Sequence, residues 1–280
     1  MLRWLAPNMA VVWLILVALV CFAAWLSALR RDKARYPQLF YGLGATAKNA
    51  LLSRHMFWVF VLSAGVTAFL SLSGYDWTLQ RWMQKTEPMG ETASRFFLVW
   101  GNFWHVGGAV LLLVYARARR SRPLFAAACA AGQAMILQLI VITGLKFLTG
   151  RRGPFNPDHV SLSPSPRFYK TEDPADFAFD FWNHTFMDGR FFWPSGHTAT
   201  AFAFAAAFTF ALWQPRVMRF AQISLPLRVL IVFLWALAFL TGFAMVDGDF
   251  HWTSDVLAGG AIGILLGAKT GLAFRRRYPG

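Results

Sequence analysis

The sequence predicts an all-α membrane protein, a polytopic bundle of about seven transmembrane helices. Of its 280 residues, 57% are hydrophobic, 17% are aromatic and only 14% are charged, which is too apolar for a soluble domain of this size. Apolar runs long enough to cross about 30 Å of hydrocarbon recur along the whole chain. They lie near Met9–Leu29, Met56–Gly74, Phe97–Ala116, Leu124–Leu148, Ser195–Trp213, Leu227–Val246 and Ser254–Phe274.

The basic residues indicate how these spans are oriented. A net charge of +14 could suggest nucleic acid, but the charges sit in short loops beside the spans, so we expect no nucleic-acid partner. The clusters fall on one side if the spans alternate, and the positive-inside rule makes that side cytoplasmic. The loop Thr149–Trp193 then faces outward. The clusters are Arg30–Arg35 with Lys48 and Arg54, Arg117–Arg122, Arg216–Arg228 and Arg275–Arg277.

The chain divides into an anchor and a working domain. Residues 1–55 read as an N-terminal anchor with a cytoplasmic basic segment, because the apolar core is too long for a signal peptide and ends in basic residues. Residues 56–280 form the working domain. Ala45–His55 is predicted as a short interfacial helix, and Tyr75–Arg95 as an amphipathic segment on the outer leaflet. We expect an inner-membrane protein of a bacterium, with its active site facing the periplasm or exterior.

A few residues inside the spans are expected to have structural roles. Cys21 and Cys129 both lie in predicted spans, so there is no disulfide framework. Asn102 and His105 lie near the outer end of the third span. Polar groups at membrane depth are candidates for function, but hydrogen-bonded packing is the role we expect here.

Trp193-Pro194-Ser195-Gly196-His197-Thr198 joins the long loop to the fifth span. Ser195 is a good N-cap, and Gly196 allows an anion to approach the backbone closely. The first amides of the helix, at the positive end of its dipole, form a phosphate site. His197 would stand beside this site as a proton donor or acceptor. The alternative is an ordinary turn in which His197 caps a membrane helix.

Three cations gather where the fourth span leaves the membrane on the outer side, against the positive-inside trend. Lys146 can extend its ammonium outward, and Arg151 and Arg152 can offer forked donors to phosphate oxygens. The alternative is nonspecific binding of lipid head groups.

A second histidine lies at an outward-facing helix start. If the last span begins near His251, Asp255 lies four residues on and shares its face. A carboxylate there can hold one imidazole nitrogen and leave the other free to attack, although the pair could simply cap the helix. The loop Phe155–Phe192 is a candidate lid or recognition surface, and its His and Asp residues match no metal-ligand spacing. We therefore expect no metal and no cofactor.

Together these residues resemble the type 2 phosphatidic acid phosphatase superfamily, whose three motifs run Lys-x6-Arg-Pro, Pro-Ser-Gly-His and Ser-Arg-x5-His-x3-Asp. The resemblance covers roughly Phe97–Phe274. The second motif is complete as Pro194–His197, the first is present as Lys146 with Pro154, and the third as His251 with Asp255. It implies a six-helix phosphatase-like core, here with an extra N-terminal helix.

The resemblance also implies roles for the residues. His251 would be the nucleophile that forms a phosphohistidine, Asp255 would orient it, and His197 would protonate the leaving group. The phosphoryl oxygens would be held by Lys146, Arg151, Arg152 and the amides of Ser195 and Gly196, with no metal.

Two positions depart from the family pattern. The arginine slot of the first motif is Gly153, for which Arg152 or Arg151 is the candidate replacement. The Ser-Arg pair of the third motif is Ala244-Met245, and nothing local replaces that arginine. Candidates from the long loop are Arg167, Lys170 and Arg190.

The leading functional prediction is a phosphatase acting at the outer face of the membrane on a lipid phosphate or diphosphate. Polyprenyl diphosphate, lipid A, phosphatidic acid and phosphatidylglycerol phosphate are candidate substrates. One alternative passes the phosphoryl or head group from the same intermediate to another alcohol. A third reading is a lipid-binding or transport protein that kept the fold and lost turnover.

Overall fold

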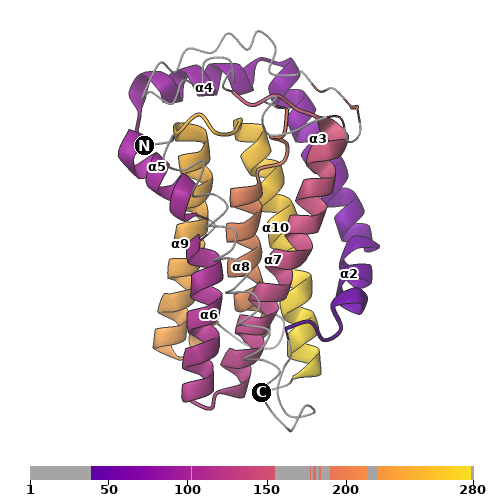
Figure 1. Cartoon of the computed structure of the whole chain (residues 1–280), viewed down its shortest axis with the longest axis vertical. Helices are drawn as coiled ribbons and strands as arrows, with labels where there is room; N and C mark the ends of the chain where they lie inside the picture. The colour runs from indigo at the N-terminus through magenta and orange to yellow at the C-terminus, as the bar shows by residue number, and fades with distance from the viewer. Residues whose placement is uncertain are drawn as a thin grey trace.

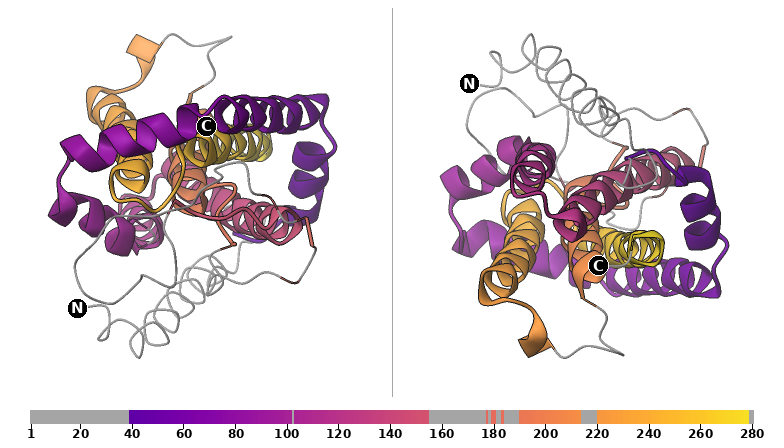
Figure 2. Two further views of the ribbon diagram at one scale, coloured as in Figure 1. Left: turned by 90° about the horizontal axis from the view of Figure 1, so that it is seen from above. Right: turned by 90° about the horizontal axis from the view of Figure 1, so that it is seen from below.

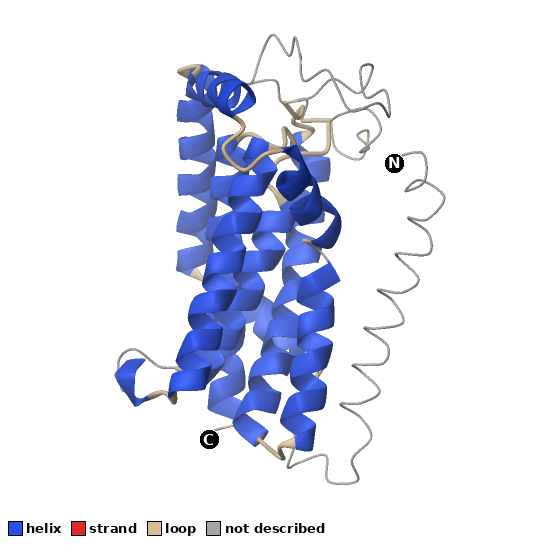
Figure 3. Ribbon diagram, turned by 90° about the vertical axis from the view of Figure 1, so that its left-hand side faces the viewer, coloured by secondary structure: helices blue, strands red, loops and turns tan. Residues whose placement is uncertain are grey.

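The computed structural model describes residues 39–278, apart from 102, 155–176, 178, 181–182, 184–189 and 214–219. Every regular element in these residues is helical (Figures 1 and 3), which confirms the predicted all-α class. The long helices stand side by side, and α4 lies across one end of the bundle, uppermost in Figure 1 and termed here the α4 end. The first predicted span, Met9–Leu29, lies outside the described residues.

Five of the remaining six predicted spans each correspond to one described helix. Four of them, α3, α7, α9 and α10, are long and apolar enough to cross a membrane, and two shorter apolar helices span Trp104–Ala118 and Gly196–Leu212. The chain is therefore an integral membrane protein. In chain order the elements are α2 (Leu43–Leu51), α3 (Arg54–Leu72), α4 (Tyr75–Thr86), α5 (Glu91–Trp100), α6 (Phe103–Ala118), α7 (Arg122–Thr149), α8 (Gly196–Leu212), η2 (Phe220–Gln222), α9 (Leu225–Asp247) and α10 (Thr253–Arg277).

The third predicted span, Phe97–Ala116, is wrong as a continuous helix. It is divided between α5 and α6, which meet at Gly101. The Gly101 amide closes α5 by donating to the Phe97 carbonyl oxygen at 2.8 Å. Glycine and the following asparagine both have low helix propensity, which explains the interruption. The break brings the end of α5 close to α8, because a Cβ built on Gly101 would lie 3.4 Å from His197 Cδ2.

The short segments predicted beside the membrane also have different bounds. The helix expected over Ala45–His55 ends at Leu51 as α2, because Ser53 caps a new helix by accepting the Met56 amide at 3.2 Å. The amphipathic segment Tyr75–Arg95 contains α4 and the first residues of α5 rather than one element. Seen from above, α4 lies over the ends of α9 and α10, which it contacts (Figure 2).

Helix α8 is the centre of the bundle. It packs against α7, α9 and α10, and twelve of its seventeen residues are buried. Its contact with α10 is close because a row of glycines on α10 faces the carbonyl oxygens of α8. A Cβ at any of these glycines would lie 2.4–2.5 Å from a carbonyl oxygen, in the pairs Gly259–Ser195, Gly263–Ala199, Gly267–Ala203 and Gly271–Ala207. Backbones this close fix the start of α8 relative to the start of α10.

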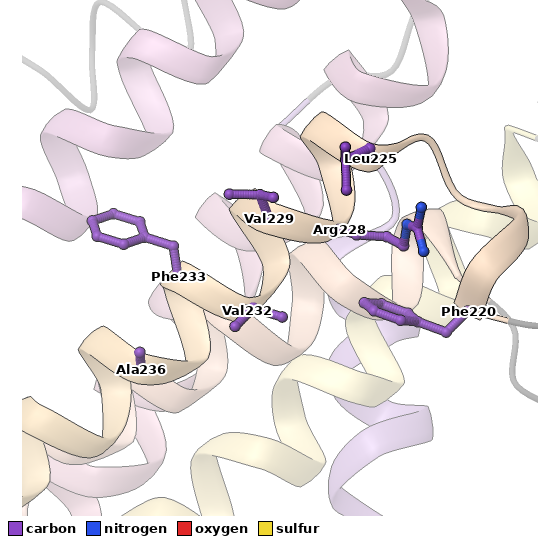
Figure 4. A pocket seen from close by; sticks show the side chains of 7 residues that line it. All are labelled: Phe220, Leu225, Arg228, Val229, Val232, Phe233 and Ala236. Atoms are coloured by element: carbon purple, nitrogen blue, oxygen red, sulfur yellow. The ribbon is translucent and has the colours of Figure 1, made fainter.

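At the opposite end of the bundle, an apolar groove of about 490 Å³ lies between η2 and the first turns of α9 (Figure 4). Phe220, Leu225, Arg228, Val229, Val232, Phe233 and Ala236 line it. None of these residues belongs to the motifs that the sequence singles out.

Candidate active site

The three sequence motifs meet at the α4 end. Helices α7 and α9 run toward this end, while α8 and α10 run away from it (Figure 1). Gly150 ends α7 in the left-handed conformation, with φ of 51°, and its amide donates to the Lys146 carbonyl at 3.1 Å. The Ser195 amide donates to the Asp255 carbonyl oxygen at 3.0 Å, which ties the start of α8 to the start of α10.

His251 and Asp255 form a buried pair in the first turn of α10 and the loop before it. His251 Nδ1 lies 3.4 Å from Asp255 Oδ2, an oxygen that also accepts the Trp252 amide at 3.1 Å. The His251 amide donates to the Met245 carbonyl at 2.9 Å, which holds the loop against the end of α9. The Nδ1–Oδ2 distance is longer than a usual hydrogen bond, as is common in catalytic pairs without substrate. With Nδ1 facing the carboxylate, Nε2 is the nitrogen available for attack.

The surroundings of His251 favour its neutral form. Burial of the ring lowers the pKa of His251 below its ordinary value, and the charges of Lys146 and Arg151 lower it further, whereas Asp255 raises it. A neutral imidazole is the form that can act as a nucleophile, so the lowered pKa is compatible with the role expected for His251.

Arg151 lies behind this pair with no exposed surface. Its Nη1 donates to Ser254 Oγ at 2.7 Å and to Asp255 Oδ1, and its Nη2 donates to Ser71 Oγ at 2.6 Å and to Asp76 Oδ2 at 2.9 Å. The guanidinium predicted to bind phosphate is thus directed at two buried carboxylates. Asp76 is not singled out by the sequence, where the only available signal is an acid on an amphipathic segment.

The start of α8 and Lys146 form the cationic part of the site. Lys146 Nζ lies 3.9 Å from a Cβ built on Gly196, so the ammonium sits beside the first turn of α8. Ser195 caps this helix, with its Oγ accepting the Thr198 amide at 3.5 Å. The Ser195 amide, predicted to hold phosphate, is instead occupied by the Asp255 carbonyl. The amides of Gly196 and His197 belong to the first turn, where no intrahelical acceptor exists.

His197 is the second residue of α8 and belongs to the same cluster. It interacts electrostatically with His251 and Lys146, and the Leu98 carbonyl of α5 accepts a hydrogen bond from its ring. The α5–α6 break therefore supplies the group that orients His197. The nucleophile candidate before α10, the proton-donor candidate in the first turn of α8 and a lysine in the last turn of α7 are thus brought together.

A family model for the PAP2 superfamily matches residues 127–278, more than half of the chain. The chain belongs to the PAP2 superfamily. The match covers the sequence motifs in α7, α8 and α10, and it confirms the resemblance read from them. PAP2 proteins are phosphatases, which supports a hydrolase acting on phosphate substrates. No curated protein and no solved structure matches the chain.

The two positions at which this PAP2 protein departs from the family pattern have other roles. A Cβ at Gly153 would lie 2.9 Å from the Phe192 ring, so Phe192 fills the space beside the first slot. The same ring meets His251 edge-on, with centroids 5.5 Å apart. Met245 is fully buried, and its carbonyl accepts the amides of both Phe250 and His251. Phe192 thus forms an apolar wall beside Gly153, and the Met245 carbonyl holds the loop that carries His251.

The remaining cations predicted for this site differ in placement. Arg152 is exposed, and its carbonyl accepts Trp252 Nε1 at 2.9 Å. Arg190 Nη1 donates to the Gly150 carbonyl at 3.3 Å, next to the end of α7. Arg167 and Lys170 lie outside the described residues.

Two other residues that the sequence singles out inside the spans are buried, namely His105 and Cys129. The His105 ring lies against Trp104 with ring centroids 3.6 Å apart and the ring planes tilted by 32°, whereas Asn102 lies outside the described residues. Cys129 is a buried free thiol. Among the residues described, no group of three or more His, Cys, Asp or Glu residues is arranged to hold a metal ion.

Proposed function

We propose that this PAP2 protein is a membrane lipid phosphatase that removes a phosphate from a lipid phosphate or diphosphate through a phosphohistidine at His251. The buried His251–Asp255 pair beside Lys146 and the start of α8 carries this proposal. A lipid substrate fits because the cluster lies where membrane-crossing helices end. A head group can reach this level while the acyl or prenyl chains stay in the bilayer.

Two steps account for the reaction. In the first, His251 Nε2 attacks phosphorus, a P–N bond forms, and the P–O bond to the leaving group breaks as His197 donates a proton to its oxygen. In the second, His197 takes a proton from water, whose oxygen attacks phosphorus and breaks the P–N bond, so inorganic phosphate leaves. Asp255 stabilises the positive charge on His251 while the P–N bond exists.

The phosphoryl oxygens are stabilised by Lys146 and the first amides of α8. Phosphoryl transfer depends mainly on positioning and on neutralising the equatorial oxygens, and a helix N-terminus beside a lysine supplies both. Arg151 contributes indirectly, since its guanidinium holds Asp255.

We assign the α4 end to the outer face of a bacterial inner membrane. The clusters Arg117–Arg122 and Arg275–Arg277 lie at the opposite end, where α6 and α10 finish and α7 begins. The positive-inside rule favours that end as cytoplasmic.

A second function, transfer of the phosphoryl or head group to another alcohol, is favoured by one observation. His251 is only 4% exposed and Phe192 packs on its ring. An apolar cover over the phosphohistidine would limit the access of water and favour a lipid alcohol as the acceptor of the phosphoryl group. The two reactions share the first step and differ in the second.

The test is phosphate release by detergent-purified protein across a panel of lipid phosphates and diphosphates, with chelator present. The wild type is compared with His251→Ala and with the control His55→Ala, whose side chain is exposed at the opposite end of α3. We expect release and an alkali-stable phosphoprotein in the wild type and the control, and neither in His251→Ala. Full release by His251→Ala would refute the proposal. A phosphorylated or exchanged lipid with little free phosphate would identify the transferase, and lipid binding without turnover would identify a non-enzymatic protein.

A further inference from the structure

One face of α4 is bound to the loop and helix that carry the nucleophile. Asp76, Gln80 and Gln84 are spaced four residues apart and so share a face. Gln80 Nε2 donates to the Val246 carbonyl at 3.0 Å and to Asp249 Oδ1 at 2.5 Å, and Gln84 Nε2 reaches the same Asp249 oxygen at 3.2 Å. Helix α4 crosses this end of the bundle (Figures 1 and 2) and precedes residues 127–278, which match the family.

Asp76 makes the deepest of these contacts. It is completely buried, and its Oδ1 accepts the Ser254 amide at 3.0 Å. Its Oδ2 accepts Arg151 Nη2 at 2.9 Å, Ser71 Oγ at 3.3 Å and Ser254 Oγ. One carboxylate therefore caps the first turn of α10, where the helix dipole favours negative charge, and also pairs with Arg151.

Arg151 is shared between two carboxylates. Its Nη2 faces Asp76 and its Nη1 faces Asp255 Oδ1, which leaves Asp255 Oδ2 toward His251. Without the charge of Asp76, the whole positive charge of Arg151 would act on Asp255 alone. Asp255 would then be drawn away from His251.

We propose that Asp76 is a positioning residue for the reaction proposed above, holding Arg151 and the first turn of α10 so that Asp255 faces His251. The inference rests on that proposed function. It also accounts for the buried position of Arg151, whose guanidinium donates to Asp255, the acid that orients His251.

Asp76→Asn tests this role, because it keeps the size of the side chain and removes its charge. We expect kcat to fall by about 10- to 100-fold, as misplacement of a reacting group by about 1 Å produces, with KM changed less than about threefold. The acid limb of kcat/KM should move to lower pH, because an uncompensated Arg151 disfavours protonated His251. The other titratable groups facing His251, namely Lys146, His197 and Asp255, are not substituted in this variant.

Two further variants separate positioning from folding. Lys85→Ala changes an exposed side chain of α4 that touches neither Arg151 nor the loop before α10, and it should keep the wild-type kcat and pH profile. Asp76→Glu keeps the charge with one more methylene, so its acid limb should match the wild type while kcat falls at least about threefold at unchanged KM. Should Asp76→Asn not fold, Asp76→Glu decides the matter, and a wild-type kcat there overturns the inference.

The outcomes also separate this inference from the proposed function. A wild type that forms no phosphohistidine would overturn the proposed function itself. A wild type that forms it, with Asp76→Asn unchanged in kcat and acid limb for each folded molecule, would overturn only the positioning role.

Discussion

The glycine row of α10 allows packing and catalysis to be separated by two matched substitutions. Gly259→Ala and Gly271→Ala would place a Cβ 2.4 Å and 2.5 Å from the carbonyl oxygens of Ser195 and Ala207, respectively. The steric conflict is thus nearly the same at both sites. They differ in position, because twelve residues of helix separate them by about 18 Å, and only Gly259 lies beside the candidate active site.

The size of the effect follows from these distances. Ordinary contacts of a Cβ begin at 3.4 Å, so α8 and α10 must separate by about 0.9–1.0 Å at either position. Overpacking of this kind costs about 1–3 kcal/mol. At Gly259 the separation of the helices would disrupt the 3.0 Å hydrogen bond from the Ser195 amide to the Asp255 carbonyl. A shift of about 1 Å in the position of reacting groups can lower the rate by about 100-fold. Both variants should lose similar stability, and only Gly259→Ala should lose about 100-fold in kcat.

The assay pairs thermal unfolding in detergent with kcat on the best lipid phosphate of the panel, measured well below the unfolding temperature. Gly107→Ala in α6 is the control, since a Cβ there meets nothing within 4 Å, and it should leave both quantities near the wild type. The reasoning would be refuted if Gly271→Ala lost as much kcat as Gly259→Ala, or if Gly259→Ala kept full activity.

Three further predictions concern the site itself. Lys146→Gln should lower kcat/KM by about 100- to 1,000-fold through loss of a charge aimed at the phosphoryl group, and a change below tenfold would show that other groups hold the phosphate. Burial lowers the pKa of His251, so its ring should still be neutral at a pH just below about 6.5, the ordinary pKa of histidine. The acid limb of the kcat/KM profile should therefore lie below that pH, and an acid limb above it would contradict this assignment. Gly153→Arg should lower the unfolding temperature, because its Cβ would lie 2.9 Å from the Phe192 ring, and adding Phe192→Ala should restore it; a single variant as stable as the wild type would show that Phe192 can move.

Local sequence patterns determined the class of fold and most of the spans. Apolar run length depends only on neighbouring residues, so α3, α7, α9 and α10 could be predicted closely. The break between α5 and α6 was also readable in principle, because Gly101 and Asn102 have low helix propensity, but the apolar residues around them concealed it. Motif spacing placed Lys146, His197, His251 and Asp255 at helix ends, and the family match now covers all four.

What each cation and amide does was decided only by the tertiary structure. Sequence spacing indicates that Arg151 stands near the site, but not that Asp76, 75 residues away in the chain, pairs with it. The Ser195 amide looks available at a helix start until α10 brings the Asp255 carbonyl to it. Hydrogen bonds and ion pairs between distant segments depend on how helices pack, and a hydrophobic or helical period carries no information about which polar groups that packing brings together.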